Sequence, residues 1–387
     1  MKKYIATILL LSSIVIGQSL SVDECVRIAL ENKPSLKRAE QDVTIARLDR
    51  ANTAATMLPS VNASNSFNEQ TYGNSSGSSE SYYAGIGLSQ SLFNFGANVQ
   101  QFKLSDTNYN VTKQQRRQAK ARIILDVHTF YYQYLKNSEL FDIAGKDLEL
   151  SKKQLDLVQN QYNLGAVSKT DFLKASVRYG TAKSNFLSRE LSKKNSEKSL
   201  RFSMGLLDSD IEINIEKKMD FILSVPTFDE AYGLMLSNSP DLNILDNQII
   251  TSKLRIKQAW SNGMPNISMN AGINASSADQ LTRGYFDDNY IKSVNISLSI
   301  PIFSGFRNKN NIQIAKLRLD QAETRLSGGT KSAKVSLYAL INTLNNYQEI
   351  IPIQEEVLIS AEEDLKLAQQ KYELGSASIL ELLDAQL

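Results

Sequence analysis

The chain has 387 residues, enough for two or three ordinary domains, and 42% of them are hydrophobic. Its 43 basic and 41 acidic residues nearly cancel, so no basic surface indicates nucleic-acid binding. Beyond the N-terminus, no stretch reaches the roughly 18 apolar residues that a membrane-spanning helix needs.

The N-terminal segment has the features of an export signal. Met1-Lys2-Lys3 is basic, residues 5–16 are almost wholly apolar, and Val15 and Gly17 fit a small-residue cleavage site. We predict a secretory signal peptide over residues 1–17, with an uncleaved anchor as the alternative. Cys25 is the only cysteine, so it cannot form an internal disulfide, and we expect it to be a small buried residue.

Two stretches of the chain recur. Asp23-Glu24 followed by Asn32-Lys33-Pro34-Ser35-Leu36 returns as Asp229-Glu230 and Asn238-Ser239-Pro240-Asp241-Leu242, at an offset (240 − 34) of 206. Later, residues 162–168 return as residues 372–378, at an offset (372 − 162) of 210. This pattern predicts two internal repeats. The four extra residues of the second copy then belong in its strand hairpin, in the 276–289 loop.

In each predicted repeat a helix gives way to two strands. The helices, 35–57 and 241–263, stop before Pro59 and Pro265. Alternation with a period of 2 then predicts strands over 61–68, 82–89, 266–275 and 293–302, joined by polar loops at 73–79 and 276–289. Each strand has an apolar face and a polar, uncharged face.

Strands of this kind suit both a soluble sandwich and a membrane barrel, and four strands would need oligomerisation to close a barrel. Five aromatic residues near the strand ends fit either a membrane-interface belt or ordinary strand aromatics: Tyr82, Tyr83, Tyr285, Phe286 and Tyr290.

A long helix follows the strands in each repeat. Residues 98–164 contain no proline, and apolar residues recur there every seven positions, which is typical of a coiled coil. Pro352 in the second copy predicts a kink or a local break. Gly165 is predicted to end the first long helix, and Ser168 to begin a return helix over 169–204. An irregular bridge, 211–225, leads to the second copy. The recurring apolar positions are Val127, Tyr134, Phe141, Leu148, Leu155 and Tyr162, and then Leu337, Leu344, Ile351, Leu358, Leu365 and Tyr372.

This combination resembles the TolC-like outer membrane efflux proteins. The resemblance rests on the opening motif (Asp23, Glu24, Asn32, Pro34, Leu36), the strand exits 92–96 and 301–305, and the hairpin tips at Gly165 and Gly375. It implies a mixed α and β fold with long coiled-coil hairpins and four membrane strands per protomer. As a homotrimer, three chains would form a 12-stranded barrel in the outer membrane of a Gram-negative cell, with a helical tunnel in the periplasm. A periplasmic adaptor protein and an inner-membrane pump or ABC exporter are the implied partners, with outer membrane lipid around the barrel.

The predicted organisation follows from these motifs. After the signal peptide we expect periplasmic helices of repeat 1 (18–57), β-hairpin 1 (58–97), coiled-coil hairpin 1 (98–207), an inter-repeat bridge (208–226), periplasmic helices of repeat 2 (227–264), β-hairpin 2 (265–306) and the coiled-coil helix of repeat 2 (307–387). The printed sequence stops at Leu387, so the return helix of the second copy would be missing. We expect such a chain to trimerise poorly.

The resemblance also implies site residues. Asp171, Tyr372, Glu381 and Asp384 match a periplasmic gate or constriction, although solvated helix surface is the simpler interpretation of the last two. Ala377 stands where a known family member has an arginine that forms a gate salt bridge. The hairpin tips would contact the adaptor through Gly165, Ala166, Val167, Ser168, Gly375, Ser376, Ala377 and Ser378.

No constellation of residues predicts enzymatic chemistry. His128 is the only histidine, and we expect it on a helix surface rather than in a catalytic or metal site. We therefore predict a passive exit duct for efflux or type I secretion, with no cofactor and no bound metal. The alternative is a trimeric coiled-coil stalk or surface protein, which would have no reason to carry two uncharged strand hairpins.

Overall fold

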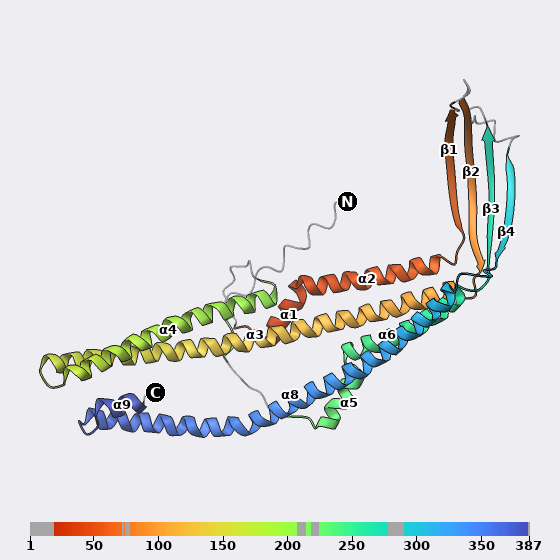
Figure 1. Ribbon diagram of the computed structural model, residues 1–387. Coiled ribbons are helices and arrows are strands. Elements are labelled where there is room, and N and C mark those ends of the chain that lie inside the picture. The colour runs from red at the N-terminus through yellow and green to blue at the C-terminus, as the bar shows by residue number, and fades with distance from the viewer. Residues whose placement is uncertain are drawn as a thin grey trace. The chain divides into compact units, whose positions relative to one another are not determined.

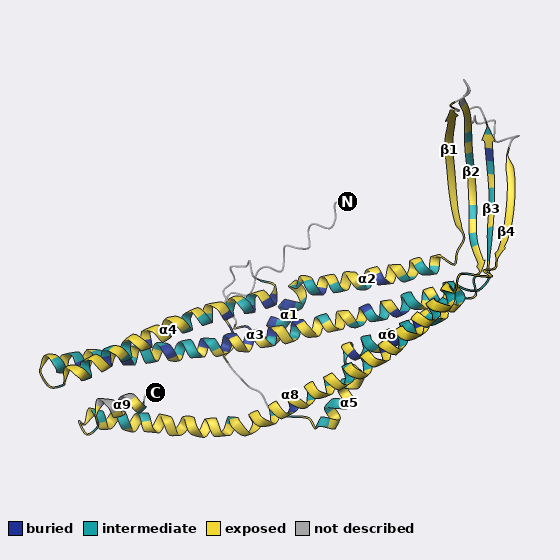
Figure 2. Cartoon of the chain, in the orientation of Figure 1, coloured by how far each residue is buried: buried dark blue, intermediate teal, exposed yellow. Residues whose placement is uncertain are grey.

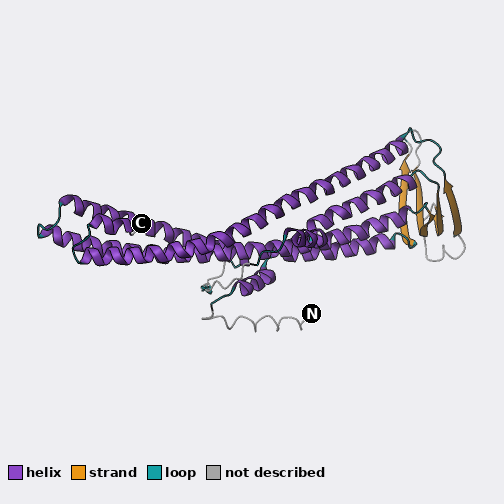
Figure 3. Ribbon diagram, turned by 90° about the horizontal axis from the view of Figure 1, so that it is seen from below, coloured by secondary structure: helices purple, strands orange, loops and turns teal. Residues whose placement is uncertain are grey.

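The computed structural model describes residues 19–71, 73, 78–206, 214–217, 224–277 and 290–385. The fold is mostly helical, and the described strands form one small sheet (Figures 1 and 3). The mixed α and β class is therefore confirmed, while the predicted signal peptide lies outside the described residues. In chain order the elements are α1 (Val22–Asn32), α2 (Pro34–Ala55), β1 (Ser60–Thr71), β2 (Ser78–Phe93), α3 (Ala97–Asn163), α4 (Lys169–Met204), α5 (Phe228–Asn238), α6 (Pro240–Ser261), β3 (Asn266–Ser277), β4 (Ile291–Ser299), α8 (Arg307–Glu373) and α9 (Ile379–Ala385).

The chain divides into two compact units. Unit 1 comprises residues 1–37, 119–232 and 335–387, and unit 2 comprises residues 38–118 and 233–334. Unit 1 contains α1, α4, α9 and the C-terminal parts of α3 and α8. Unit 2 contains the sheet, most of α2, α6 and the N-terminal parts of α3 and α8.

The long helices begin and end close to their predicted residues. The stretch predicted over 98–164 is α3, and the predicted return helix is α4, which ends at Gly205 in a left-handed conformation. Of the two outcomes predicted at Pro352, a kink or a local break, the break does not occur, because α8 continues through the proline over 67 residues. A proline inside a helix removes one backbone donor and costs about 3 kcal/mol, which a long helix can absorb without ending. None of the described helices is long and apolar enough to cross a membrane.

Tyr131 holds the core of unit 1 together. It lies on α3 in a buried cluster with Cys25 of α1 and Leu200 of α4. Its hydroxyl lies 3.1 Å from the carbonyl oxygen of Leu20 and 3.0 Å from that of Glu216. Burial raises the pKa of Tyr131 to about 12. Cys25 is fully buried, as predicted, and burial raises the pKa of its thiol to about 11.

The sheet has two chemically different faces. Its strands are antiparallel in the order β1-β2-β3-β4 (Figure 1). The register lines up Val61, Leu88, Ala271 and Val294 in one row across all four strands. The next row along is polar or glycine: Asn62, Gly87, Gly272 and Ser293. Much of the sheet surface is exposed in this chain (Figure 2), so the apolar face has no cover among the described residues.

Several strand boundaries differ from prediction, and two of them have a clear physical reason. The strand predicted over 293–302 ends at Ser299, because Pro301 has no backbone N–H to donate to a ladder. The strand β2 begins at Ser78, inside the predicted loop 73–79, because Ser78 and Ser79 pair with Thr71 and Gln70. Residues 278–289 of the second predicted loop lie outside the described residues.

The α3–α4 hairpin packs through side chains at helical spacing. Phe141 and Phe186 have ring centroids 5.0 Å apart, and Arg178 forms an ion pair with Asp147 at 2.7 Å. Gln154 of α3 is only 7% exposed, yet its amide nitrogen and oxygen find no hydrogen-bond partner among the described residues. A buried polar group of this kind reduces stability, and in coiled coils it can fix the register.

We predict that Gln154→Leu stabilises the protein. Replacing an unpaired buried amide with an apolar side chain of similar size should contribute about 1–3 kcal/mol. The midpoint of thermal unfolding should rise. Gln159→Leu is the matched control, because Gln159 already donates a hydrogen bond to Asn163 at 3.2 Å and should give no such gain. A lower midpoint for Gln154→Leu would show that its amide is satisfied in the folded protein.

Candidate functional site

The two hairpin tips of unit 1 share one backbone design. Gly165 has φ of 76° and Gly375 has φ of 71°, a left-handed conformation that favours glycine. Each glycine N–H bonds the carbonyl three residues earlier, at 2.9 and 3.0 Å. The next N–H bonds the carbonyl five residues earlier, at 2.8 and 2.9 Å. These bonds form a Schellman cap, so the predicted glycine caps are confirmed.

A serine starts the helix after each tip. The Ser168 hydroxyl accepts the Asp171 N–H at 3.2 Å, and the Ser168 backbone N–H donates to the Asp171 carboxylate at 3.3 Å, so the two residues form a capping box. The Ser168 hydroxyl also donates to that carboxylate at 2.7 Å. The Ser168 hydroxyl also holds the pKa of Asp171 below its ordinary value. At the second tip the Ser378 hydroxyl accepts the Glu381 N–H at 3.3 Å. Asp171 and Glu381 therefore occupy the same position, the third residue of the helix after the tip.

The structure brings Asp171 close enough to Tyr372 for their charges to interact. Tyr372 is half-buried, and its pKa is raised mainly by burial and then by the charge of Asp171. The corresponding tyrosine of the first tip, Tyr162, instead stacks on Phe172 with ring centroids 5.5 Å apart. Tyr372 thus lies near Asp171, which the sequence analysis assigned to the same predicted gate.

The other predicted gate residues are solvent-exposed. Glu381 and Asp384 lie on α9, and their spacing of three residues places them on one face of the helix. Of the residues expected to contact an adaptor, Ala166, Ser168, Ser376 and Ser378 are exposed as well. The tips therefore present small side chains and carboxylates to solvent.

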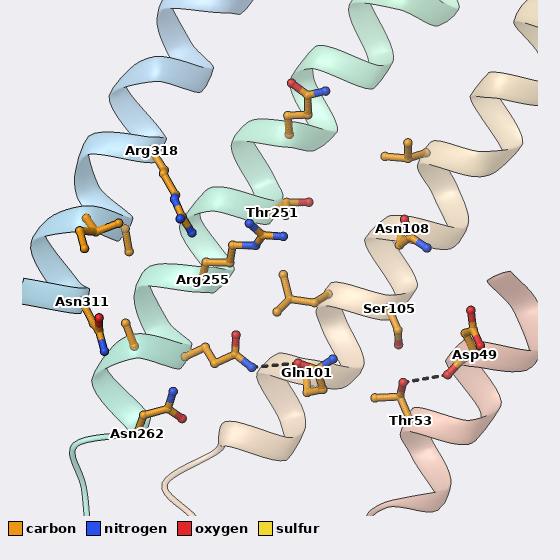
Figure 4. Close-up of a pocket in the computed structure, with 17 residues that line it drawn as sticks. Asp49, Thr53, Gln101, Ser105, Asn108, Thr251, Arg255, Asn262, Asn311 and Arg318 are labelled. Carbon is orange, nitrogen blue, oxygen red and sulfur yellow. Dashed lines mark hydrogen bonds between the residues drawn. The ribbon is translucent and has the colours of Figure 1, made fainter. Parts of the chain in front are cut away.

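Sequence reasoning missed a polar groove in unit 2. The groove has a volume of about 830 Å³ and is lined by one stripe from each of α2, α3, α6 and α8 (Figure 4). Its residues are spread from Asp49 to Arg318, so no local motif marks them. A signal was present on α6, where polar residues recur at helical spacing: Gln248, Thr251, Arg255, Gln258 and Asn262.

Within the described part of the chain, no three side chains of His, Cys, Asp or Glu gather in a way that could hold a metal ion. His128 is half-buried on α3, and its nearest ring neighbour is Tyr132, at 6.3 Å between centroids.

Comparison with known proteins identifies the family. Residues 25–206 and 231–387 match the family described as outer membrane efflux protein. The chain belongs to this family. It is an efflux protein of the outer membrane, and it extends into the periplasm.

Among its relatives is the cation efflux system protein CusC of Escherichia coli O157:H7. The two are 26% identical over 368 residues, covering 92% of this chain and 78% of CusC. The outer membrane protein TolC of Escherichia coli K12 is 24% identical over 380 residues, covering 92% of this chain and 74% of TolC.

Solved structures share the fold. A crystal structure of CusC matches with a TM-score of 0.82 at 20% identity, covering 96% of this chain and 88% of that one. The CmeC outer membrane channel of Campylobacter jejuni matches with a TM-score of 0.78 at 17% identity, covering 94% and 79%.

We predict that Ser168→Ala loosens the first tip. The variant loses the hydroxyl that caps α4, and the pKa of Asp171 should rise toward its ordinary value of 3.8. Because the folded pKa lies below that value, the ionised carboxylate stabilises the turn above about pH 4 and ceases to do so as pH falls through the folded pKa. Amide exchange over residues 166–172 should therefore be faster in the variant at pH 7.

A matched control separates the cap from the loss of any hydroxyl. Ser184 is exposed in the middle of α4, so Ser184→Ala should leave exchange at the tip unchanged. Equal amide exchange at the tip in Ser168→Ala and in the native protein would contradict the stabilising role of this cap.

Proposed function

We propose that this chain is one protomer of an exit duct that carries solutes across the outer membrane and periplasm and performs no chemistry of its own. Membership of the outer membrane efflux family is the observation that carries this proposal. The sheet supports it, because its apolar rows suit lipid and its uncharged polar rows suit a wet lumen.

The edges of the sheet support a trimer. In the described chain β1 and β4 are edge strands, each with one side unpaired. Backbone groups in lipid must be hydrogen-bonded, so a membrane sheet has to close into a barrel. Three copies of four strands give the 12-stranded barrel, with β4 of one protomer pairing with β1 of the next.

The strand register supports the two internal repeats. Ser60 pairs with Ser89. The residues 206 positions after Ser60 and 210 positions after Ser89 are Asn266 and Ser299, and these two also pair. The change of offset therefore falls between β3 and β4, beyond the pair Asn274–Ile291. This agrees with an insertion of four residues at the end of the second hairpin.

The hairpin tips are the proposed gate and docking end. Asp171, Tyr372, Glu381 and Asp384 form the constriction in this proposal, and residues 165–168 and 375–378 contact the periplasmic adaptor. The adaptor links the duct to an inner-membrane pump or ABC exporter. Supporting observations are the exposure of Glu381 and Asp384 and the effect of the charge of Asp171 on the pKa of Tyr372.

The coiled-coil stalk is set aside as an alternative. It would account for α3, α4 and α8, but it has no use for a sheet with one apolar and one polar face. The family match covers both sets of elements, since residues 25–206 and 231–387 include the long helices and all four strands.

The first test is localisation and conductance. The protein should be recovered in the outer membrane fraction, and the purified protein should open discrete single channels in planar lipid bilayers. Recovery in the soluble periplasm would contradict the duct, as would bilayers that stay silent when the protein has inserted.

We predict that the double variant Glu381→Gln/Asp384→Asn lowers the preference of the channel for cations. Carboxylates facing a narrow lumen attract cations and repel anions. The reversal potential in a KCl gradient should move toward that of an unselective pore. The variant Glu362→Gln/Glu363→Gln is the control, because it removes two exposed acidic residues of α8 and should have no comparable effect. An unchanged reversal potential would remove Glu381 and Asp384 from the constriction.

A further inference from the structure

The polar groove of unit 2 is lined by an unusual balance of charge. Figure 4 shows α8, α6, α3 and α2 side by side, each contributing side chains to the groove. Asp49, Arg255 and Arg318 are its charged residues, and the others are amides, hydroxyl groups and small or apolar side chains. The lining therefore carries one carboxylate against two guanidinium groups.

The two guanidinium groups share one region of the groove. Arg318 extends from α8 toward α6, and Arg255 extends from α6 toward α3 (Figure 4). Neither forms an ion pair with a carboxylate of the described residues. Asp49 does not neutralise them, because it lies on α2, with α3 and α6 between it and α8 (Figure 4).

One arginine close to the groove is neutralised. Arg50, close to the groove in sequence, pairs with Asp106 at 2.7 Å. Two amides of the groove bind each other, since Gln258 of α6 donates a hydrogen bond to Gln101 of α3 at 2.8 Å. Arg255 and Arg318 therefore keep their five N–H donors each for a partner from solution.

We propose that Arg255 and Arg318 form a binding site for small oxyanions, such as solutes that carry phosphate or carboxylate groups, on the lumen wall of the duct. This inference rests on the proposed function and extends it to a class of solute. Guanidinium groups bind phosphate and carboxylate oxygens in a bidentate manner, and arginine stays charged at any physiological pH.

The surroundings strengthen the attraction without making the site permanent. A cleft with an excess of one sign of charge concentrates counter-ions, and a trimer would repeat the pair three times. Both arginines are exposed, so bound anions exchange with solvent and remain screened by salt over roughly 8–10 Å. Exchangeable binding is what a conduit needs, because a solute must leave as well as enter.

Pyrophosphate block of single channels tests the site. The protein is reconstituted in planar bilayers at low salt, and pyrophosphate is added to each side in turn. We expect the native channel to be blocked, and the half-blocking concentration to rise at least about tenfold in Arg255→Gln/Arg318→Gln, as the loss of charge-assisted hydrogen bonds implies. Arg255→Lys/Arg318→Lys, which retains both charges, should recover part of the block.

The matched control is Lys257→Gln/Lys316→Gln. Each lysine lies two residues from one of the arginines on the same helix, about 200° around the axis, and neither lines the groove. This control should be blocked like the native channel. The inference is overturned when pyrophosphate does not block the native channel, when the arginine variant is blocked equally well, or when the lysine control loses as much block. A native protein that conducts no current at all refutes the duct itself, and the inference with it.

Discussion

The sheet of β1 to β4 places the strongest constraint on this protein. It has two edge strands and a row of exposed apolar side chains, including Val61 and Val294, which are 64% and 72% exposed in the single chain. Unpaired backbone groups cost several kcal/mol each in lipid, and an exposed edge in water invites aggregation. A partner for both edges is therefore a condition of stability. In the proposed trimer, neighbouring copies supply that partner, with β4 of one chain pairing with β1 of the next.

The helical part solves a different problem, that of ending long helices cleanly. A helix end leaves four carbonyls or four N–H groups without partners. At the tips, glycine in the left-handed conformation satisfies the carbonyls, and Ser168 and Ser378 satisfy N–H groups. This local function also accounts for Asp171, whose carboxylate completes a capping box. Asp171 already stabilises the start of α4, and gating would be a second role of the same side chain. A variant at Asp171 alone therefore cannot separate capping from gating.

Local signals in the sequence were sufficient for most of the fold. The ends of α4 follow from Ser168 and Gly205, each of which has a preferred place at a helix end. The end of β4 was predicted three residues late, because alternation was followed past Pro301, although proline cannot donate to a ladder. The continuity of α8 through Pro352 does not follow from the local signal of the proline, because one lost hydrogen bond counts for little against the rest of a 67-residue helix.

Contacts between residues that are far apart in the sequence and lie on different helices could not be predicted. Arg255 and Arg318 are 63 positions apart (318 − 255), and only the packing of α6 against its neighbours puts both in one groove. Charge counts hide them as well, because 43 basic residues against 41 acidic predict no net field.

Selectivity in a duct depends on which charges are left unpaired at the wall rather than on the total. In this chain the unpaired guanidinium groups of Arg255 and Arg318 are in unit 2, whereas the exposed carboxylates of the proposed constriction, Glu381 and Asp384, are in unit 1. In the proposed duct, a solute that passed both sets would meet charges of opposite sign. A solute carrying both charges would then be attracted at each, while a simple cation or anion would be held at one and repelled at the other.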